Sequence, residues 1–466
     1  MIPLSLEAVA AAVGGRLCDV PDPSVLMTAP AVVDSRTVQP GGLFAALPGE
    51  HADGHVFAPN AVKVGAVAVL ATRPVGVPAV IVDDVLDALA ALARTVLAAV
   101  PEATVIGLTG SAGKTSTKDL IAQVLPELGE TLATVQSFNG EIGMPLTITH
   151  LDQGVRYLVL EMGARGIGHI AHLTRIAPPT VGLVLNVGTA HVGEFGGREQ
   201  IAKAKGELVE ALPADGLAIL NADDPLVTAM TSRTRARVLT FGIEAEADVR
   251  ALDVALDTSG RASFTLAAEG AQARVDLTLH GAHHVSNALA AAAVAIGLGA
   301  GVEKTAAALS RAVLVASGRM EVTDRPDGVR IINDAFNANP DSMKAAFTAL
   351  AAMTGERRTI AVLGEMKELG DGGSEEHREV GRLVAAAGID VLIAVGGDDA
   401  SAMAAAAQQD NPQLTVASAR DRDHALTLAR DLIQSGDIVL VKGSHSVELE
   451  HTAERLAQPD TVAVSQ

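Results

Sequence analysis

The chain of 466 residues has no Trp, one Tyr and one Cys, and aromatic residues make up only 2% of it. A lone cysteine, Cys18, cannot form an internal disulfide and fits a reducing cytoplasm, where we expect this protein. Scarce aromatic rings leave little material for stacking on single-stranded nucleic acid. Basic residues are also few, 35 against 55 acidic ones, and a formal net charge of −20 argues against a nucleic-acid partner.

Long apolar runs are missing as well. The stretch that comes nearest, residues 85–100, contains Asp87 and Arg94 and is predicted to be an amphipathic helix. The N-terminal segment lacks a basic start and carries Glu7, which argues against a secretory signal. We therefore expect no membrane span. Hydrophobic residues still make up 48% of the chain, and its length predicts two to four domains.

Turn signals and apolar runs favour an α/β protein of three domains. We expect a small N-terminal α/β domain over residues 1–83, a central domain over 84–316 and a C-terminal Rossmann-like domain over 317–466. Self-contained domains of this kind make a monomer our expectation.

Continuous apolar runs are typical of buried parallel strands. The expected strands are 66–70 and 79–82 in the first domain, 105–108, 157–160 and 181–185 in the second, and 330–332, 360–363, 391–395 and 438–441 in the third. Residues 275–279 alternate between apolar and polar, and residues 257–260 supply a turn. This pattern adds an antiparallel ribbon to the mostly parallel central sheet.

The strongest motif follows the strand at 105–108 and opens a helix. It runs Gly110, Ser111, Ala112, Gly113, Lys114, Thr115, Ser116. Glycine-lined amides and a helix N-terminus bind phosphates, Lys114 would reach the β- and γ-phosphates, and the Thr115 hydroxyl would hold Mg²⁺. Leu108 stands where the general motif has its first glycine. The alternative interpretation is a glycine-rich turn with a solvated lysine.

Two further polar residues follow neighbouring strands. Glu161 ends one apolar run and His191 comes shortly after the next. Since ligands collect beyond the carboxyl ends of parallel strands, both are candidate Mg²⁺ ligands beside the triphosphate. Taken alone, the glutamate could be a cap or an ion-pair partner, and the histidine could pack or cap a helix.

At this point the residues resemble those of the Mur ligase family. The segment 110–115, Glu161, His191, Lys205 and the segment 283–289 are similar to its ATP-binding domain. Segments 34–36, 40–44 and 53–55 are similar to its UDP-sugar-binding domain, and 362–370 and 441–444 to its third domain. The segment 334–343 resembles the signature of the family members that add D-alanyl-D-alanine.

The resemblance implies a role for each matching position. Contacts with ATP are implied for Gly110, Ser111, Ala112, Gly113, Lys114, Thr115, Ser116, Asn287, Arg319 and Asp334. Contacts with the other substrates are implied for Ser35, Arg36, Asn139, Asn337, Asn339, Glu365 and Lys442. Catalytic roles are implied for Lys114, Glu161, His191 and Lys205, and two Mg²⁺ ions would be held by Thr115, Glu161 and His191.

The reaction implied is an ATP-dependent amide ligation through an acyl phosphate. The small-molecule substrates would be UDP-N-acetylmuramoyl-tripeptide and D-alanyl-D-alanine, and the product a UDP-linked pentapeptide precursor of peptidoglycan. Alternatives are a ligase that adds another amino acid, a folylpolyglutamate-type ligase, and a P-loop ATPase that ligates nothing.

Some positions depart from the family pattern or have simpler explanations. Phe336 replaces a usual Tyr, Glu365 a frequent Asp, and Gly140 a usual second Asn. Residues 337–340 would form a good turn whatever their chemistry. Lys205 could be an ordinary surface lysine or, by resemblance, a carbamate, and Arg319 and Lys442 could be solvated charges.

Overall fold

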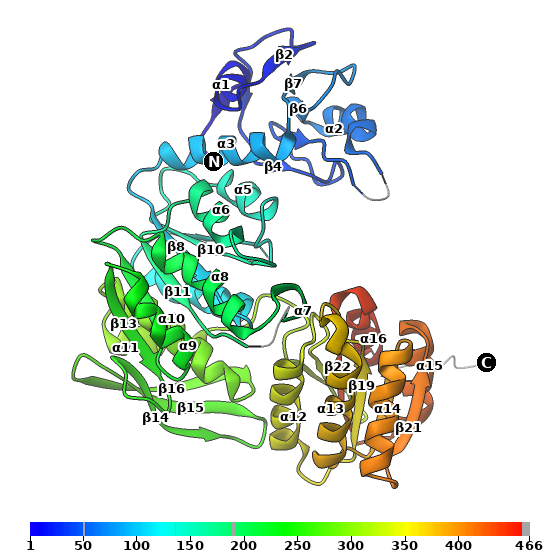
Figure 1. Cartoon of the computed structure of the whole chain (residues 1–466). Coiled ribbons are helices and arrows are strands. Elements are labelled where there is room, and N and C mark those ends of the chain that lie inside the picture. The colour runs from blue at the N-terminus through cyan, green and yellow to red at the C-terminus, as the bar shows by residue number, and fades with distance from the viewer. Residues whose placement is uncertain (50–51, 136, 189–191, 459–466) are drawn as a thin grey trace.

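The computed structural model describes residues 1–49, 52–135, 137–188 and 192–458. Figure 1 shows three α/β domains, with the N-terminal domain in blue at one end and the C-terminal domain in yellow to red at the other. Each domain is built on a sheet of its own, and most strand pairs in these sheets are parallel. The predicted fold class is confirmed.

The N-terminal sheet has the order β2-β7-β6-β5-β4, in which only β2 runs antiparallel to its neighbour. Its strands are β2 (Arg16–Cys18), β4 (Ala31–Val32), β5 (Leu43–Ala45), β6 (Ala68–Ala71) and β7 (Ala79–Ile81), and β1 (Leu4–Ser5) pairs separately with β3 (Leu26–Met27). The helices are α1 (Leu6–Ala12), α2 (Ala58–Val64) and α3 (Val85–Ala98), with the short 3₁₀ turn η1 (Gly54–Phe57). The predicted strands near 68–70 and 79–81 are confirmed.

Helix α3 joins the N-terminal domain to the central one. The Asp84 carboxylate caps it by accepting hydrogen bonds from the N–H groups of Leu86 and Asp87. Its buried face carries Leu89 and Leu92 into an apolar core shared by both domains. The amphipathic helix predicted over 85–100 is therefore confirmed.

The central sheet has the order β16-β15-β14-β13-β12-β11-β8-β10-β9. Its strands are β8 (Thr104–Thr109), β9 (Thr131–Ala133), β10 (Tyr157–Glu161), β11 (Val181–Val184), β12 (Leu217–Asn221), β13 (Arg237–Gly242), β14 (Val249–Leu256), β15 (Arg261–Ala268) and β16 (Ala271–His280). Neighbouring strands are parallel from β9 along the sheet to β14. Strands β14, β15 and β16 pair in antiparallel fashion and form the expected ribbon.

Helices cover both faces of the central sheet. They are α4 (Lys114–Val124), α5 (Gly143–Ile148), α6 (His169–Ile176), α7 (Val192–Phe195), α8 (Arg198–Glu210), α9 (Pro225–Thr228), α10 (His283–Gly297) and α11 (Val302–Arg311), with 3₁₀ turns η2 (Leu125–Glu127) and η3 (Ala229–Arg233). Helices α4, α10 and α11 pack in one core, and α6 and α8 pack in the other. The strands between these two cores carry apolar side chains on both faces of the sheet. They therefore appear in the sequence as continuous apolar runs.

The third domain has the sheet order β17-β18-β22-β19-β20-β21, in which β17 is antiparallel and the other pairs are parallel. Its strands are β17 (Glu321–Asp324), β18 (Arg330–Asn333), β19 (Thr359–Gly364), β20 (Val391–Val395), β21 (Thr415–Ala419) and β22 (Ile438–Lys442). Helices α12 (Pro340–Thr354), α13 (Gly373–Ala386) and α14 (Asp398–Asp410) pack in one core, and α15 (Arg422–Leu432) and α16 (Leu449–Ala457) in the other. Two 3₁₀ turns, η4 (Gly370–Gly372) and η5 (His445–Val447), complete it.

The linker between the central and third domains is fastened to helix α4. The side-chain amide of Gln123 donates to the carbonyl of Val313 at 2.7 Å and accepts from its N–H at 3.0 Å. Asp119 accepts from the N–H of Ala316 at 3.1 Å. The helix that begins at the glycine-rich loop thus also holds the chain that leads into the third domain.

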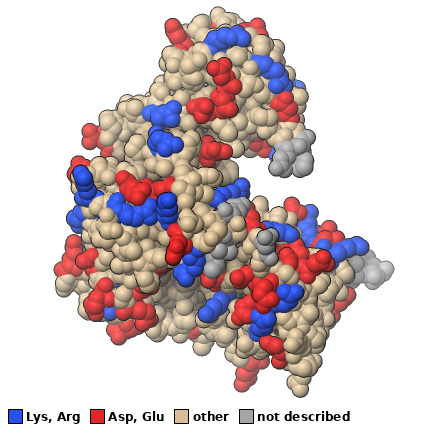
Figure 2. All heavy atoms as spheres, in the orientation of Figure 1, with Lys and Arg blue, Asp and Glu red and all other residues tan. Residues whose placement is uncertain are grey.

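Figure 2 shows the molecule hollowed between the N-terminal and third domains. Beside this hollow the central and third domains touch, and a Cβ on Gly193 of α7 would overlap the main chain of Gly370. In the part of the chain that the structure describes, no helix combines the length and apolarity needed to cross a membrane.

Candidate active site

A cleft of about 1080 Å³ lies where the central and third domains meet. The glycine-rich loop, the ends of β10 and β11 and the start of α10 line it from the central domain. The third domain contributes residues that follow β18, β19 and β22. Only Val33 lines it from the N-terminal domain among the described residues. The carboxyl ends of parallel strands therefore open into this cleft, as expected for an open sheet.

The glycine-rich loop connects β8 to α4, and its conformation at position 113 favours glycine. Gly113 has φ +80°, and a Cβ there would overlap Oδ1 of Asn287 on α10. The Lys114 amine donates to the carbonyl of Gly110 at 3.0 Å, so its chain folds back over the loop. Burial lowers the pKa of Lys114, and the nearby Glu161 carboxylate opposes that shift.

Asn186, just beyond β11, holds the same loop from the neighbouring strand. Its Oδ1 accepts from the N–H groups of Ser111 and Ala112, each at 2.9 Å, and its Nδ2 donates to the carbonyl of Ala112 at 3.2 Å. We did not predict a role for Asn186. The signal that could have indicated this role is the position of Asn186 directly after a buried strand, next to the loop in the sheet.

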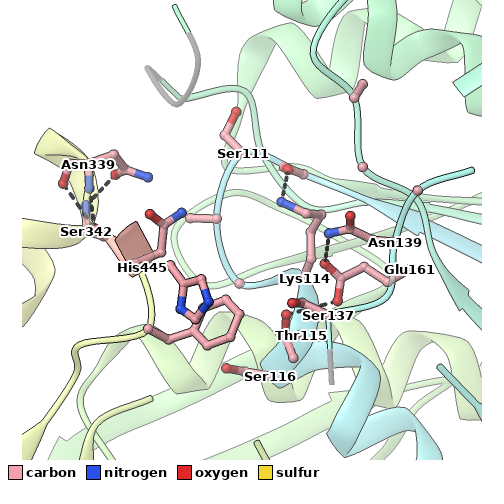
Figure 3. Close-up of a pocket in the computed structure, with 18 of the residues that line it drawn as sticks. Ser111, Lys114, Thr115, Ser116, Ser137, Asn139, Glu161, Asn339, Ser342 and His445 are labelled. Carbon is pink, nitrogen blue, oxygen red and sulfur yellow. Dashed lines mark hydrogen bonds between the residues drawn. The ribbon is translucent and has the colours of Figure 1, made fainter. Parts of the chain in front are cut away.

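Glu161 sits at the floor of the cleft with 1% of its surface exposed. Its Oε2 accepts from the Thr115 hydroxyl at 2.9 Å and its Oε1 from the side-chain amide of Asn139 at 2.8 Å. Figure 3 shows Thr115, Glu161 and Asn139 linked in this order beside Lys114. The structure thus brings together four predicted site residues from β10, α4 and the loop before α5.

Lys205, on α8, has only 4% of its surface exposed and lines the cleft. The interpretation of Lys205 as a surface lysine is therefore wrong. Burial lowers the pKa of its amine well below the usual value, and the charge of Lys114 lowers it further. His191, the other predicted catalytic residue, lies outside the described residues.

Arg319 of the third domain contacts the first turn of α4, directly after the loop. One of its terminal nitrogens lies 3.3 Å from the Thr115 hydroxyl, and its guanidinium lies over the Phe336 ring at 4.1 Å. The Phe336 ring also stacks on the His445 ring, with the two ring centroids 5.5 Å apart. Burial lowers the pKa of Arg319, and its buried Nε has no hydrogen-bond partner among the described residues. Arg319 is thus a buried cation rather than a solvated one.

Lys442 and Asp334 form an ion pair that lines the cleft, with the lysine buried and the Asp334 side chain 14% exposed. The Lys442 amine donates to Asp334 Oδ2 at 2.7 Å and to the carbonyl of Asn337 at 2.8 Å. With 2% of its surface exposed, Lys442 is not a solvated charge. It fixes the strand ends from which Asp334 and Asn337 face the cleft.

Asn339 lines the cleft and also begins helix α12. Its side chain accepts from the N–H of Ser342, and the Ser342 hydroxyl accepts from the N–H of Asn339. This capping box, visible in Figure 3, is the turn role anticipated for residues 337–340. The cap uses the side-chain oxygen of Asn339. The contact between Asn339 and a substrate stays a prediction.

Asn287 reaches the loop from α10. Its Nδ2 lies 3.3 Å from Nδ1 of His284, whose other ring nitrogen is buried and has no partner in the part of the chain that the structure describes. Burial lowers the pKa of His284 well below its usual value, with His283 adding to the shift. An uncharged imidazole therefore supports the amide that touches Gly113.

Three predicted substrate residues are not among those that line the cleft. The Arg36 side chain, 84% exposed, pairs with Asp34 at 2.7 Å in the N-terminal domain, next to the buried Ser35. Glu365 accepts from the N–H of Gly397 at 2.7 Å and pairs with Lys367. Instead of Glu365, the neighbouring Lys367 and Glu368 face the cleft.

A phosphate-type loop, a buried glutamate beside it and a second domain that closes the cleft define a nucleotide-dependent enzyme of several domains. Comparisons with known proteins give the family. Models of the Mur ligase family match the chain as its catalytic domain over residues 32–97, its middle domain over 108–295 and its glutamate ligase domain over 318–445. The chain belongs to the Mur ligase family.

Relatives resemble the chain along its whole length. The UDP-N-acetylmuramoyl-tripeptide–D-alanyl-D-alanine ligase of Mycobacterium bovis is 46% identical, over 99% of each chain. The enzyme of that name from Escherichia coli is 36% identical over 92% of this chain and 93% of its own. The crystal structure of MurF from Acinetobacter baumannii has a TM-score of 0.87 at 31% identity, covering 98% of this chain and 100% of that one. MurF ligase from Thermotoga maritima in complex with ADP has a TM-score of 0.77 at 30% identity, covering 92% and 97%.

Proposed function

We propose that this protein joins D-alanyl-D-alanine to the terminal carboxyl group of UDP-N-acetylmuramoyl-tripeptide at the expense of ATP. The observation that carries the proposal is the cleft itself. There a phosphate-type loop and the buried Glu161 of the central domain face the third domain's Arg319. Relatives of this name, alike along the whole chain, support the choice of substrates.

The chemistry proceeds in two transfers. A carboxylate oxygen of the tripeptide attacks the γ-phosphorus of ATP and ADP leaves, which gives an acyl phosphate. The amine of D-alanyl-D-alanine then attacks the acyl carbon, loses a proton and expels inorganic phosphate. Carboxylate and triphosphate repel each other, so cations must gather around the reacting phosphoryl group.

Lys114 and Arg319 are the cations in place for this task. Burial lowers the pKa of both groups, and an anionic triphosphate beside them favours their charged forms. The buried Nε of Arg319, which no described residue accepts from, is a donor that an anion would satisfy. A loop of main-chain N–H groups at the start of α4 supplies the remaining contacts.

The residues around Glu161 fit a magnesium ion. Mg²⁺ takes oxygen ligands and commonly uses one or two carboxylates together with substrate phosphates. Glu161 and the Thr115 hydroxyl offer such oxygens, although the described residues contain no cluster of three or more His, Cys, Asp and Glu. When bound, the ion neutralises phosphate charge. We propose that Thr115, Glu161 and His191 together hold two Mg²⁺ ions.

Lys205 has the environment for the carbamate that the family resemblance implies. A neutral amine can add to the carbon of CO₂ and release one proton, and burial favours the neutral form of Lys205. The added carboxylate would then lie in the cleft that Lys205 lines.

We propose that each of three domains binds a different substrate, with the domain boundaries after residues 83 and 316. Residues 1–83, with Ser35 and Arg36, hold the uridine diphosphate, and residues 84–316 bind ATP. Residues 317–466 hold the dipeptide through Asn337, Asn339 and the loop after β19. Arg319 and Asp334 approach ATP from this third domain.

Phosphate release tests the proposal. Rapid release should need ATP, UDP-N-acetylmuramoyl-tripeptide and D-alanyl-D-alanine together, and single amino acids should not replace the dipeptide. An ATPase that ligates nothing would release phosphate without either substrate. Equal rates with a single amino acid would point to another Mur-type ligase.

A further inference from the structure

The amides of the glycine-rich loop fall into two groups. Those of Ser111 and Ala112 are both held by Oδ1 of Asn186, and the Ser111 N–H also points to the main-chain oxygen of Asn186 at 3.1 Å. Donation from Nδ2 of Asn186 to the Ala112 carbonyl completes the attachment. One side chain therefore satisfies the first half of the loop from outside it.

The second group consists of the amides at the start of α4. Thr117 makes the first helical bond, to the carbonyl of Gly113 at 2.9 Å, and the helix has no side-chain cap. Within the described residues, the N–H groups of Gly113, Lys114, Thr115 and Ser116 have no acceptor. They are the orphan donors of a helix N-terminus, and they face the cleft in which a phosphate would lie.

Asn186 is itself held on both sides. The carbonyl of Leu185 accepts from the Asn221 amide at 2.8 Å. The N–H of Val187 donates to Asp224 at 2.7 Å, and the carbonyl of Val187 accepts from Arg198 at 2.8 Å. The strand end that carries Asn186 therefore has little freedom to follow the loop if the loop moves.

We propose that Asn186 is a positioning residue for the nucleotide. By fastening Ser111 and Ala112, it fixes the loop so that the four amides from Gly113 to Ser116 already converge before a phosphate arrives. Donors aligned in advance need no reorganisation on binding. The inference rests on the proposed binding of ATP at this loop, and goes beyond it by naming what shapes the loop.

Substitution of Asn186 by alanine tests this role, with Asp223→Ala as the matched control. The Asp223 carboxylate also holds a loop by its main-chain N–H groups, those of residues 243–245, but Asp223 does not line the cleft. We expect Asn186→Ala to weaken ADP binding, measured by calorimetry, at least about tenfold. The KM for ATP should rise similarly while the KM for D-alanyl-D-alanine stays within about twofold.

The control separates positioning from general damage. Asp223→Ala should lower the melting temperature, because three main-chain N–H groups lose their acceptor, but it should bind ADP like the parent. Equal losses of ADP affinity in both variants, or parent-like affinity in Asn186→Ala, would overturn the inference. If the parent itself did not bind ADP, the proposed function would fail instead.

Amide hydrogen exchange of the unsubstituted protein gives a second test that does not depend on a variant folding. Without nucleotide, the amides of Ser111 and Ala112 should exchange more slowly than those of Gly113 to Ser116. Added ADP should slow exchange at Gly113 to Ser116 and leave Ser111 and Ala112 almost unchanged. Fast exchange at Ser111 and Ala112 that slows only with ADP would contradict the assignment.

Discussion

Replacing Gly113 by alanine should cost the protein about 2–3 kcal/mol. A left-handed conformation costs a residue with a Cβ about 1–2 kcal/mol, and Gly113 has φ +80°. The new methyl group would also overlap Oδ1 of Asn287, whose amide lies 3.3 Å from His284. Turning that amide away loses a hydrogen bond worth roughly 1 kcal/mol. If the loop keeps its shape, this free-energy cost lowers the free energy of unfolding. If the loop shifts to relieve the strain, it lowers the affinity for ADP instead.

Both quantities can be measured on one preparation. Urea unfolding gives the free energy of unfolding and calorimetry gives the affinity for ADP, and we expect their combined loss to reach about 2 kcal/mol or more. Gly140→Ala is the matched control, because Gly140 also lines the cleft but has ordinary φ and no atom within 4 Å of a new Cβ. If Gly113→Ala matched this control in both measurements, the account of the loop would be wrong.

Three other perturbations concern ionisable groups that are buried or nearly so. Lys442→Met should destabilise the fold by about 1.5–3 kcal/mol, because the Asp334 carboxylate, 14% exposed, loses its charged partner, and adding Asp334→Asn should recover part of that loss in urea unfolding. Burial holds the pKa of His284 below its usual 6.5, so the unfolded chain takes up the proton first. Stability should therefore be full above about pH 6.5 and fall by up to about 1.4 kcal/mol per pH unit below it. His284→Asn should flatten that acid slope, and an unchanged slope would exclude this histidine as its source. Glu161→Gln should lower kcat at least about 100-fold with an unchanged circular dichroism spectrum, and near-normal turnover would remove the carboxylate from the mechanism.

Elements with a strong local pattern could be predicted from the sequence. Strands β8, β10 and β11 carry side chains into two apolar cores and so appear as unbroken apolar runs. The sequence predicts the loop before α4 because glycines, lysine and threonine stand between such a strand and a helix. Strands β9 and β21, which are short or only partly buried, lack that pattern and were not predicted.

Contacts between distant segments could not be predicted in the same way. Nothing local to Asn186 shows that its amide will fasten Ser111 and Ala112, some 75 residues earlier in the chain. Burial is a second example: Lys205 sits in a polar helical segment, and only the packing of α8 against the sheet removes it from water. Glu365 does not line the cleft for a similar reason. Its carboxylate accepts from the N–H of Gly397 and pairs with the amine of Lys367.

The transfer of oxygen from substrate to phosphate tests the central claim most directly. UDP-N-acetylmuramoyl-tripeptide labelled with ¹⁸O in its terminal carboxyl group should be incubated with ATP, D-alanyl-D-alanine and the protein. An acyl phosphate requires that one labelled oxygen leave with each phosphate, so the released phosphate should carry a single ¹⁸O. Phosphate free of label, formed along with the amide product, would contradict the account.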